Sequence, residues 1–460
     1  MEQITSSKSR PQLLFEGYCY RKERVLVDDR ESWRCAMSTC KGRIHVNGDN
    51  VHLVSQHGHA PDPAQCGSKK SQSSLRNRAA RSNDAARRII QETQTETPAE
   101  SIAVMPKYKS LQRTVQRQRR RDGEPIAAPR NVAEIDIPNN LRRSIRGENF
   151  LLHDSGSDDE HRFFIFGTAE NLHLLKEHKN WFADGTFKMA PQLFYQVYTI
   201  HVLCHGSVVP AVYVLLLNKT QECYIRVLQQ IRNIDPEIQP ESVMCDFEKA
   251  FQNAVRNVFG DAVHITGCLF HLSQCVWRKI QQLQLSQEYQ GDEQKRTFCK
   301  MLLALAFVPA DEIVTAFETV IENIPENFEP LVDYFEDTWI GRPFRRGRRN
   351  PTFPPDMWSV YSRVQTDLPR TNNAVEGWHN AMQSTLGHHH PTFYKLVEVL
   401  RLEQSHTENR LVRLNAGHRD AANSTYMRVT SALKTVVADF ENRNTEEYLR
   451  AISYNLKMHN

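Results

Sequence analysis

The strongest constraint on the fold is a pair of strand-forming runs on either side of a glycine turn. Residues 193–203 and 208–217 are rich in β-branched and aromatic side chains, and Gly206 lies in the turn between them. Such runs predict a β-hairpin, and the second, almost wholly apolar run predicts a strand buried on both faces. Another strand-like run, residues 181–187, precedes them and carries Asp184. The sequence therefore predicts an antiparallel sheet with a carboxylate inside it.

The remainder of the chain from residue 162 alternates strand-like and helix-like patterns. Strands are predicted at residues 163–166, 242–245 and 264–269, and helices at residues 169–178, 221–231 and 248–259. This alternation predicts an α/β fold. A length of 460 residues suggests two or three domains. No apolar run reaches about 18 residues, so no membrane span is expected, and the polar first ten residues predict no secretory signal.

Four potential metal ligands lie within a short N-terminal stretch. Cys35 and Cys40 stand close together, and His57 and His59 follow a predicted hairpin with an Asn47-Gly48 turn. Two thiols followed by two imidazoles form the Cys₂His₂ pattern of a tetrahedral zinc site. A unit of this size also needs a staple, because its core is small. Four incidental residues in a loop are the weaker interpretation.

This N-terminal stretch resembles the FLYWCH zinc finger over about residues 12–62. The resemblance rests on its aromatic opening, the Trp33-Arg34-Cys35 motif and the closing His57-Gly58-His59 motif. It implies a small β-rich domain that binds DNA or protein.

A strongly basic region follows at residues 68–150. Between Lys69 and Arg121 there are fourteen Lys and Arg residues and only four acidic ones. Such an excess is expected where a protein contacts a phosphate backbone. The candidate DNA-binding residues are Arg117, Arg119, Arg120 and Arg121, which also match a weak nuclear-import pattern. A solvated basic linker is the alternative.

A second arginine cluster lies at residues 341–350, among glycine and proline. Its members are Arg345, Arg346, Arg348 and Arg349. We expect a flexible loop that contacts DNA, and the alternative is a plain exposed loop.

Two further carboxylates can join Asp184. Asp246 closes a short apolar strand before an amphipathic helix, and Glu376 lies on a predicted helix, in one polar stripe with Asn372 and Asn380. Three converging carboxylates repel one another unless cations neutralise them. Oxygen ligands with open positions suit Mg²⁺ or Mn²⁺, and two such ions about 3.5–4 Å apart promote phosphodiester chemistry.

Residues 160–402 resemble the transposase domain of Mutator-like elements. The matching motifs are Ala-Asp-Gly-Thr-Phe at Asp184, Met-Cys-Asp-Phe-Glu-Lys-Ala at Asp246, Cys-Leu-Phe-His at Cys268 and His271, and Asn-Asn-Ala-Val-Glu-Gly-Trp-His-Asn at Glu376. The resemblance implies a ribonuclease H-like fold of the DDE class, catalytic metal ligands at the three carboxylates, and a homo-oligomer. A helical insertion is expected at about residues 281–365, and a helical extension at residues 403–460.

The Cys268 and His271 pair has two interpretations of about equal weight. The resemblance implies an accessory pair in the active site, whereas a buried thiol and a satisfied core histidine are the simpler structural explanation.

The first functional hypothesis is a nuclear DNA transposase, or a protein derived from one, that cleaves and transfers DNA strands. The alternative is a catalytically inactive, zinc-dependent DNA-binding transcriptional regulator. A third is non-functional relic coding sequence, against which the intact motifs argue mildly.

Overall fold

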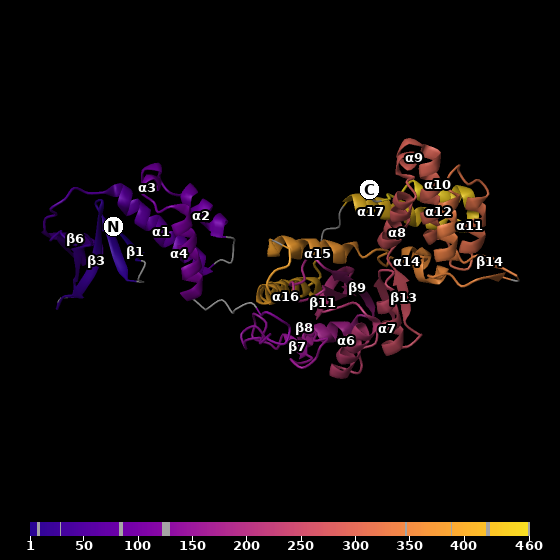
Figure 1. The fold of residues 1–460 in the computed structure, drawn as a ribbon, viewed down its shortest axis with the longest axis horizontal. Coiled ribbons are helices and arrows are strands. Elements are labelled where there is room, and N and C mark those ends of the chain that lie inside the picture. The colour runs from indigo at the N-terminus through magenta and orange to yellow at the C-terminus, as the bar shows by residue number, and fades with distance from the viewer. Residues whose placement is uncertain are drawn as a thin grey trace. The chain divides into compact units, whose positions relative to one another are not determined.

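The chain divides into two compact units, residues 1–127 and 128–460 (Figure 1). The computed structural model describes residues 1–6, 10–27, 29–81, 86–121, 129–345, 347–387, 389–419 and 424–458. The fold of each unit is considered by itself.

The N-terminal unit begins with a six-stranded antiparallel sheet. Its strands follow the chain order: β1 (Glu2–Thr5), β2 (Pro11–Phe15), β3 (Tyr18–Val25), β4 (Glu31–Cys35), β5 (Arg43–Asn47) and β6 (Asn50–Ser55). The predicted hairpin is β5–β6, with Asn47 opposite Asn50 and Gly48 at a φ of 57°. Tyr20 and Trp33 fill a small core. The predicted β-rich N-terminal region is thus confirmed, whereas β1 was not predicted.

Four helices complete this unit: α1 (Pro63–Arg81), α2 (Ala86–Thr95), α3 (Ala99–Ala103) and α4 (Tyr108–Arg121). The sequence pattern predicts helices at residues 79–90 and 108–121. The second is confirmed by α4, whereas the first is divided between the end of α1 and the start of α2, and its residues 82–85 lie outside the described residues. Leu75 of α1, Ile90 of α2, and Leu111 and Val115 of α4 bury one another in a core of their own. From residue 68 to residue 121 the basic region is therefore a packed helical bundle where the structure describes it, whereas residues 129–150 contain no helix.

The second unit contains a seven-stranded mixed sheet with the order β13-β12-β9-β10-β11-β8-β7. Its strands are β7 (Leu151–Asp154), β8 (Phe164–Phe166), β9 (Asn180–Thr186), β10 (Gln196–Cys204), β11 (Ser207–Leu216), β12 (Ser242–Cys245) and β13 (His264–Gly267). Strands β9, β10 and β11 form an antiparallel meander, and β12 and β13 continue the sheet parallel to β9. The mixed α/β fold is thus confirmed, and so is the burial of most of β11.

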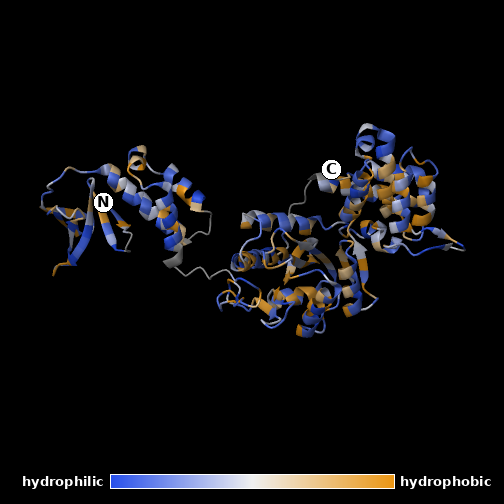
Figure 2. Ribbon diagram, in the orientation of Figure 1, coloured by the Kyte–Doolittle hydropathy of each residue, from blue (hydrophilic) through white to orange (hydrophobic). Residues whose placement is uncertain are grey.

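Helices cover both faces of this sheet (Figure 1). The core on one face includes α5 (Ala169–Glu177), α6 (Gln221–Ile234), α7 (Lys249–Phe259) and α8 (Leu269–Gln282). The core on the other face includes α15 (Asn373–Leu386) and α16 (Phe393–Asn415). Polar and apolar residues alternate along the helices in Figure 2, as expected for elements with one buried side.

The remaining helices lie before and after α15 and α16 in the chain: α9 (Ser286–Gly291), α10 (Glu293–Ala304), α11 (Ile313–Ile321), α12 (Glu329–Phe335), α13 (Pro355–Trp358), α14 (Tyr361–Gln365), α17 (Ser424–Ala438) and α18 (Thr445–Ser453). The hydroxyl of Tyr448 on α18 donates to the carbonyl of Phe307, so the end of the chain packs on the helices that follow α8. Among the described helices, we find none with the length and apolar character to span a membrane.

Candidate metal centres

The four predicted zinc ligands meet in the N-terminal unit. Cys35 ends β4, Cys40 lies in the turn before β5, and both histidines follow β6. The Cys35 Sγ and His59 Nε2 atoms are 3.4 Å apart, and so are the Cys40 Sγ and His57 Nδ1 atoms. One donor atom from each of the four residues lies within 4.8 Å of the others. This donor set fits a tetrahedral zinc ion.

Neighbouring groups fix the orientation of both imidazoles. Tyr18 stacks on His57 with a centroid distance of 3.7 Å, and the Tyr20 hydroxyl lies 2.8 Å from its Nε2 atom. The Nδ1 atom of His59 lies 2.8 Å from the carbonyl oxygen of Ala60. Each histidine therefore turns one nitrogen toward a thiol while its other nitrogen has a second partner, as is usual at zinc sites.

Gly42 provides the space that His57 occupies. A Cβ atom at position 42 would lie 2.5 Å from the Nδ1 atom of His57. The N–H group of Gly42 also donates to the Cys40 Sγ atom at 3.3 Å. The glycine in the turn after Cys40 is thus part of the site, a role that its place in the sequence did not predict.

A second group of potential ligands forms in the other unit. Asp184 of β9, His271 of α8 and Glu376 of α15 each place one ligand atom within 4.8 Å of the other two. The His271 Nε2 and Glu376 Oε1 atoms are 3.7 Å apart. The fold therefore brings together two of the three predicted carboxylates and the histidine whose role was left open.

Asn372 ties together the elements that carry these three ligands. Its N–H group donates to the Cys268 Sγ atom at 3.1 Å, and its side-chain amide donates to the Ala183 carbonyl at 3.1 Å. Asn372 and Cys268 are both fully buried, and burial raises the pKa of the Cys268 thiol to about 12. Cys268 thus accepts a hydrogen bond inside the protein, while His271 faces the carboxylates.

The predicted polar stripe on α15 divides into different environments. Asn372 is fully buried, Glu376 is partly buried and Asn380 is exposed. These three residues therefore follow one side of the helix from a buried to an exposed position. Asn372 is buried at the start of α15, where its side chain donates to the Ala183 carbonyl of β9, whereas Asn380 lies further along the helix.

Asp246 lies directly after β12 and is partly buried. Its carboxylate accepts the N–H group of Glu248 at 3.1 Å, which holds it at the start of α7. It is not one of the three residues grouped around Asp184, but its negative charge raises the pKa of Asp184, so it acts on the same site.

His379 contacts the site, although its sequence motif predicted no role for it. Its Nδ1 atom lies 3.7 Å from the Asp184 Oδ2 atom, and its Nε2 atom lies 3.2 Å from the Thr199 hydroxyl. The Thr199 hydroxyl is in turn 3.0 Å from His201 Nε2. The Trp-His pair that follows Glu376 was the available signal, but contact with Thr199 depends on the packing of α15 on the sheet.

Burial and neighbouring negative charges favour the neutral forms of the titratable side chains in this site. Burial, together with the charges of Asp246 and Glu376, raises the pKa of Asp184 to about 8. Burial raises the pKa of Glu376 to about 7, lowers the pKa of His379 to about 4 and also lowers the pKa of His271. A bound cation would reverse this preference and favour the carboxylates. The donor set and its electrostatics therefore fit a divalent metal ion.

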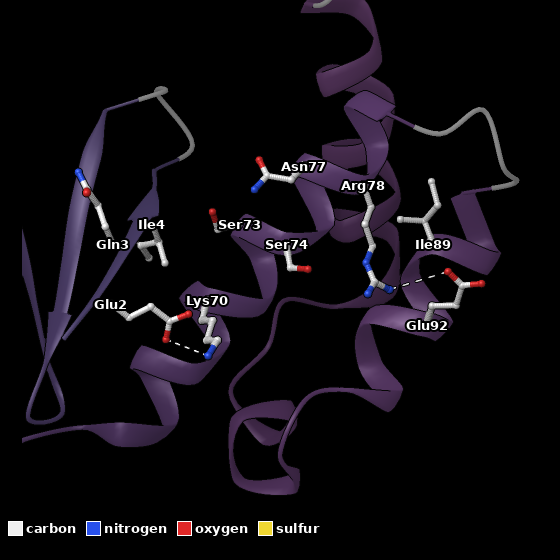
Figure 3. A pocket seen from close by; sticks show the side chains of 10 residues that line it. All are labelled: Glu2, Gln3, Ile4, Lys70, Ser73, Ser74, Asn77, Arg78, Ile89 and Glu92. Atoms are coloured by element: carbon white, nitrogen blue, oxygen red, sulfur yellow. Dashed lines mark ion pairs between the residues drawn. The ribbon is translucent and has the colours of Figure 1, made fainter.

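The basic residues of the helical bundle fall into two sets. Arg78 and Lys70 on α1 line a cavity of about 500 Å³ in which Arg78 pairs with Glu92 at 3.8 Å and Lys70 with Glu2 at 2.8 Å (Figure 3). On α4, by contrast, Lys109, Arg113 and Arg117 are exposed, and none has an acidic partner among the described residues. The predicted Arg119, Arg120 and Arg121 have side chains outside the described set.

The second arginine cluster forms a short hairpin of β14 (Pro343–Phe344) and β15 (Gly347–Arg348). Arg348 pairs with Glu318 and Glu336, both at 2.7 Å, so its charge is used within the protein. Arg345 and Arg349 are exposed and lie over the ring of Phe344. Arg346 lies outside the described residues.

Two family models match parts of the chain. Residues 180–275 match the MULE transposase domain, and residues 3–60 match the FLYWCH zinc finger domain. Both resemblances drawn from the sequence are thereby confirmed. The FLYWCH match and the Cys₂His₂ cluster together support a structural zinc ion. No curated protein matches the chain.

Proposed function

We propose that the chain is a DNA transposase, or a protein derived from one, whose second unit is a ribonuclease H-like DDE domain. The strand order supports this fold: an antiparallel meander of β9, β10 and β11, extended by β12 and β13 parallel to β9. The first carboxylate then lies on the first strand of the meander, and the second follows β12.

The observation that carries the proposal is the meeting of Asp184, His271 and Glu376, which come from distant parts of the sequence. In this proposal Asp184, Asp246 and Glu376 hold Mg²⁺ or Mn²⁺, with His271 beside them. The ions would supply Lewis acidity to the reacting oxygens of a DNA phosphodiester.

The protein's own residues orient and isolate this site. His379 lies against the Asp184 carboxylate and limits its rotation, while Asn372 anchors the start of the helix that carries Glu376. Asp184 is only 8% exposed, so bulk water is largely excluded from its side of the site. Fixed groups in such a site act more strongly than they would in water.

DNA binding is assigned to the N-terminal unit. The zinc finger and the free cations of α4 would contact the DNA backbone, because each phosphate contact releases condensed counterions. With this function we propose a nuclear location and assembly into a homo-oligomer.

A cleavage assay tests the enzymatic proposal. The full-length protein is incubated with Mg²⁺ and DNA that carries the ends of its own element, and strand breaks are measured for the unchanged protein, Asp184→Asn and Asp261→Asn. We expect Asp184→Asn to lose activity, and the exposed Asp261 serves as the matched control.

Two results would contradict the proposal. Activity of Asp184→Asn equal to that of the unchanged protein would exclude Asp184 as a ligand. Binding of the DNA without any cleavage by the unchanged protein would favour the transcriptional regulator instead.

A further inference from the structure

The second unit contains a hollow whose walls include chain neighbours of His271 and Glu376. It has a volume of about 360 Å³, and its walls come from the start of α8, the segment before α15, helix α17 and the end of the chain. Phe270 in its wall directly precedes His271, and Asn373 in its wall lies one helical turn before Glu376. The hollow therefore opens beside two residues of the candidate metal centre.

Arg370 is the unusual residue of this hollow. It is only 8% exposed, yet its guanidinium has no carboxylate partner among the described residues. Its Nη1 atom donates to the Thr430 hydroxyl at 3.2 Å, and its guanidinium lies 5.3 Å from the centroid of the Tyr426 ring. A buried cation without an anion is costly to the fold.

Other buried arginines of this unit show that the chain can supply partners. Arg162 is 4% exposed and pairs with Asp154 at 2.7 Å. Arg363 is also buried without a carboxylate, but it donates to the Pro369 carbonyl and does not line the hollow. Arg370 alone combines burial, the lack of an anion and access to the hollow among these three.

The rest of the wall suits a planar, apolar group. Phe270 and Tyr426 are both in the wall, and Val429 and Leu433 of α17 add apolar surface. Aromatic side chains stack on nucleic-acid bases whatever the base identity. The volume falls in the range of sites that hold a small organic ligand.

We propose that this hollow binds one nucleotide of the DNA strand beside the metal centre, with its phosphate on Arg370 and its base against Phe270 and Tyr426. The proposal rests on the DNA-processing function above and deepens it. In this proposal α17, which follows the transposase-like region, contributes residues to the DNA-binding site. Because stacking and a phosphate contact carry no base code, this contact positions the strand and leaves sequence recognition to other parts of the protein.

The test measures binding of a short single-stranded oligodeoxynucleotide that contains 2-aminopurine. The full-length protein is used in buffer without divalent cations, so that no cleavage takes place. Affinity is measured by anisotropy, stacking by 2-aminopurine quenching, and folding by the melting temperature. The variants are Arg370→Met and, as a control for loss of one positive charge, Arg428→Met, whose target is exposed on α17.

We expect Arg370→Met to weaken binding about tenfold or more, because a charge-assisted contact is lost. Its melting temperature should stay the same or rise, since an unpaired buried charge is removed. Arg428→Met should bind like the unchanged protein. Unchanged affinity in Arg370→Met, or no quenching by the unchanged protein, would overturn the proposal.

A third variant tests the proposal if Arg370→Met loses both DNA binding and stability. Phe270→Leu keeps the charge and most of the apolar surface, and we expect it to lose the quenching while its melting temperature holds. Quenching equal to that of the unchanged protein would refute the proposal. Binding is measured without metal, so a negative result here leaves the outcome of the Asp184→Asn cleavage assay unaffected.

Discussion

The pH dependence of stability tests the electrostatics of the candidate metal centre through Asp184→Asn. The pKa of Asp184 is about 8 in the folded protein, compared with an ordinary value of 3.8. The folded state therefore holds a proton that the unfolded state releases above pH 4. Stability that is present at acid pH is lost as the pH rises toward 8.

The size of the effect follows from this difference. One pKa unit corresponds to about 1.4 kcal/mol, and the folded carboxyl stays mostly protonated between pH 5 and 7.5. Over these 2.5 units the metal-free protein should lose about 3 kcal/mol through this residue alone. For a unit of this size, about 2 °C per kcal/mol gives a fall of about 6 °C in melting temperature. Asn at position 184 cannot titrate, so the variant lacks this contribution.

The assay compares the two proteins in buffer without divalent cations at pH 5 and pH 7.5. Tryptophan fluorescence reports on this unit, because Trp181 lies on the same strand as Asp184. The difference between the two proteins isolates the Asp184 contribution from other titrating groups. Addition of Mg²⁺ at pH 7.5 should then stabilise the unchanged protein and not the variant.

A difference between the two proteins that does not change with pH would refute the reasoning. It would mean that the Asp184 carboxylate is charged and compensated in the metal-free fold. Equal stabilisation of both proteins by Mg²⁺ would place the ion elsewhere.

Two further predictions concern the N-terminal unit. Gly42→Ala should weaken zinc retention, measured by competition with a colorimetric chelator, because its new Cβ would lie 2.5 Å from the Nδ1 atom of His57. Gly58→Ala is the matched control, since a Cβ at position 58 has nothing within 4 Å. Equal zinc loss in both variants would contradict the steric argument. Arg113→Ala should lower the slope of DNA affinity against salt concentration by about 1, since it removes one free cation. Arg78→Ala should leave that slope almost unchanged, because Arg78 is paired with Glu96 at 2.6 Å, and equal changes in both slopes would exclude α4 as the contact surface.

The sheet of the second unit was predictable because most of its strands have a clear apolar pattern in their own residues. The apolar run that became β11 and the glycine turn before it define a hairpin without help from the rest of the chain. Strand β1 was missed because Ile4 is its only aliphatic residue, and its pairing with β2 supplies the rest of its stability. Strand β7 was missed for a similar reason, since all four of its residues are only partly buried.

The candidate site was predictable only as far as motifs reach. Asp184 and Glu376 could be named from their motifs, but His379 and Thr199 meet only after α15 packs on the sheet. Arg348 shows the opposite error. Its arginine-rich surroundings predict an unpaired cation, but Glu318 and Glu336, from earlier segments of the chain, pair with it. Contacts between distant segments decide both cases, and local composition carries no information about them.

The zinc site of the finger and the candidate metal site of the second unit differ in the contacts that hold their residues together. In the finger, the cysteines and histidines are themselves the links between strands in a unit with a small core, so zinc contributes to folding. In the second unit, hydrogen bonds between neutral groups link the elements, because Asn372 bonds α15 to β9 and to the Cys268 thiol before α8. Burial, together with the charges of Asp246 and Glu376, raises the pKa of Asp184, so the fold assembles the site at an electrostatic cost. If the proposed cation binds there, the site is already assembled before the cation binds. Removal of zinc should therefore unfold the finger, whereas removal of Mg²⁺ should leave the second unit folded.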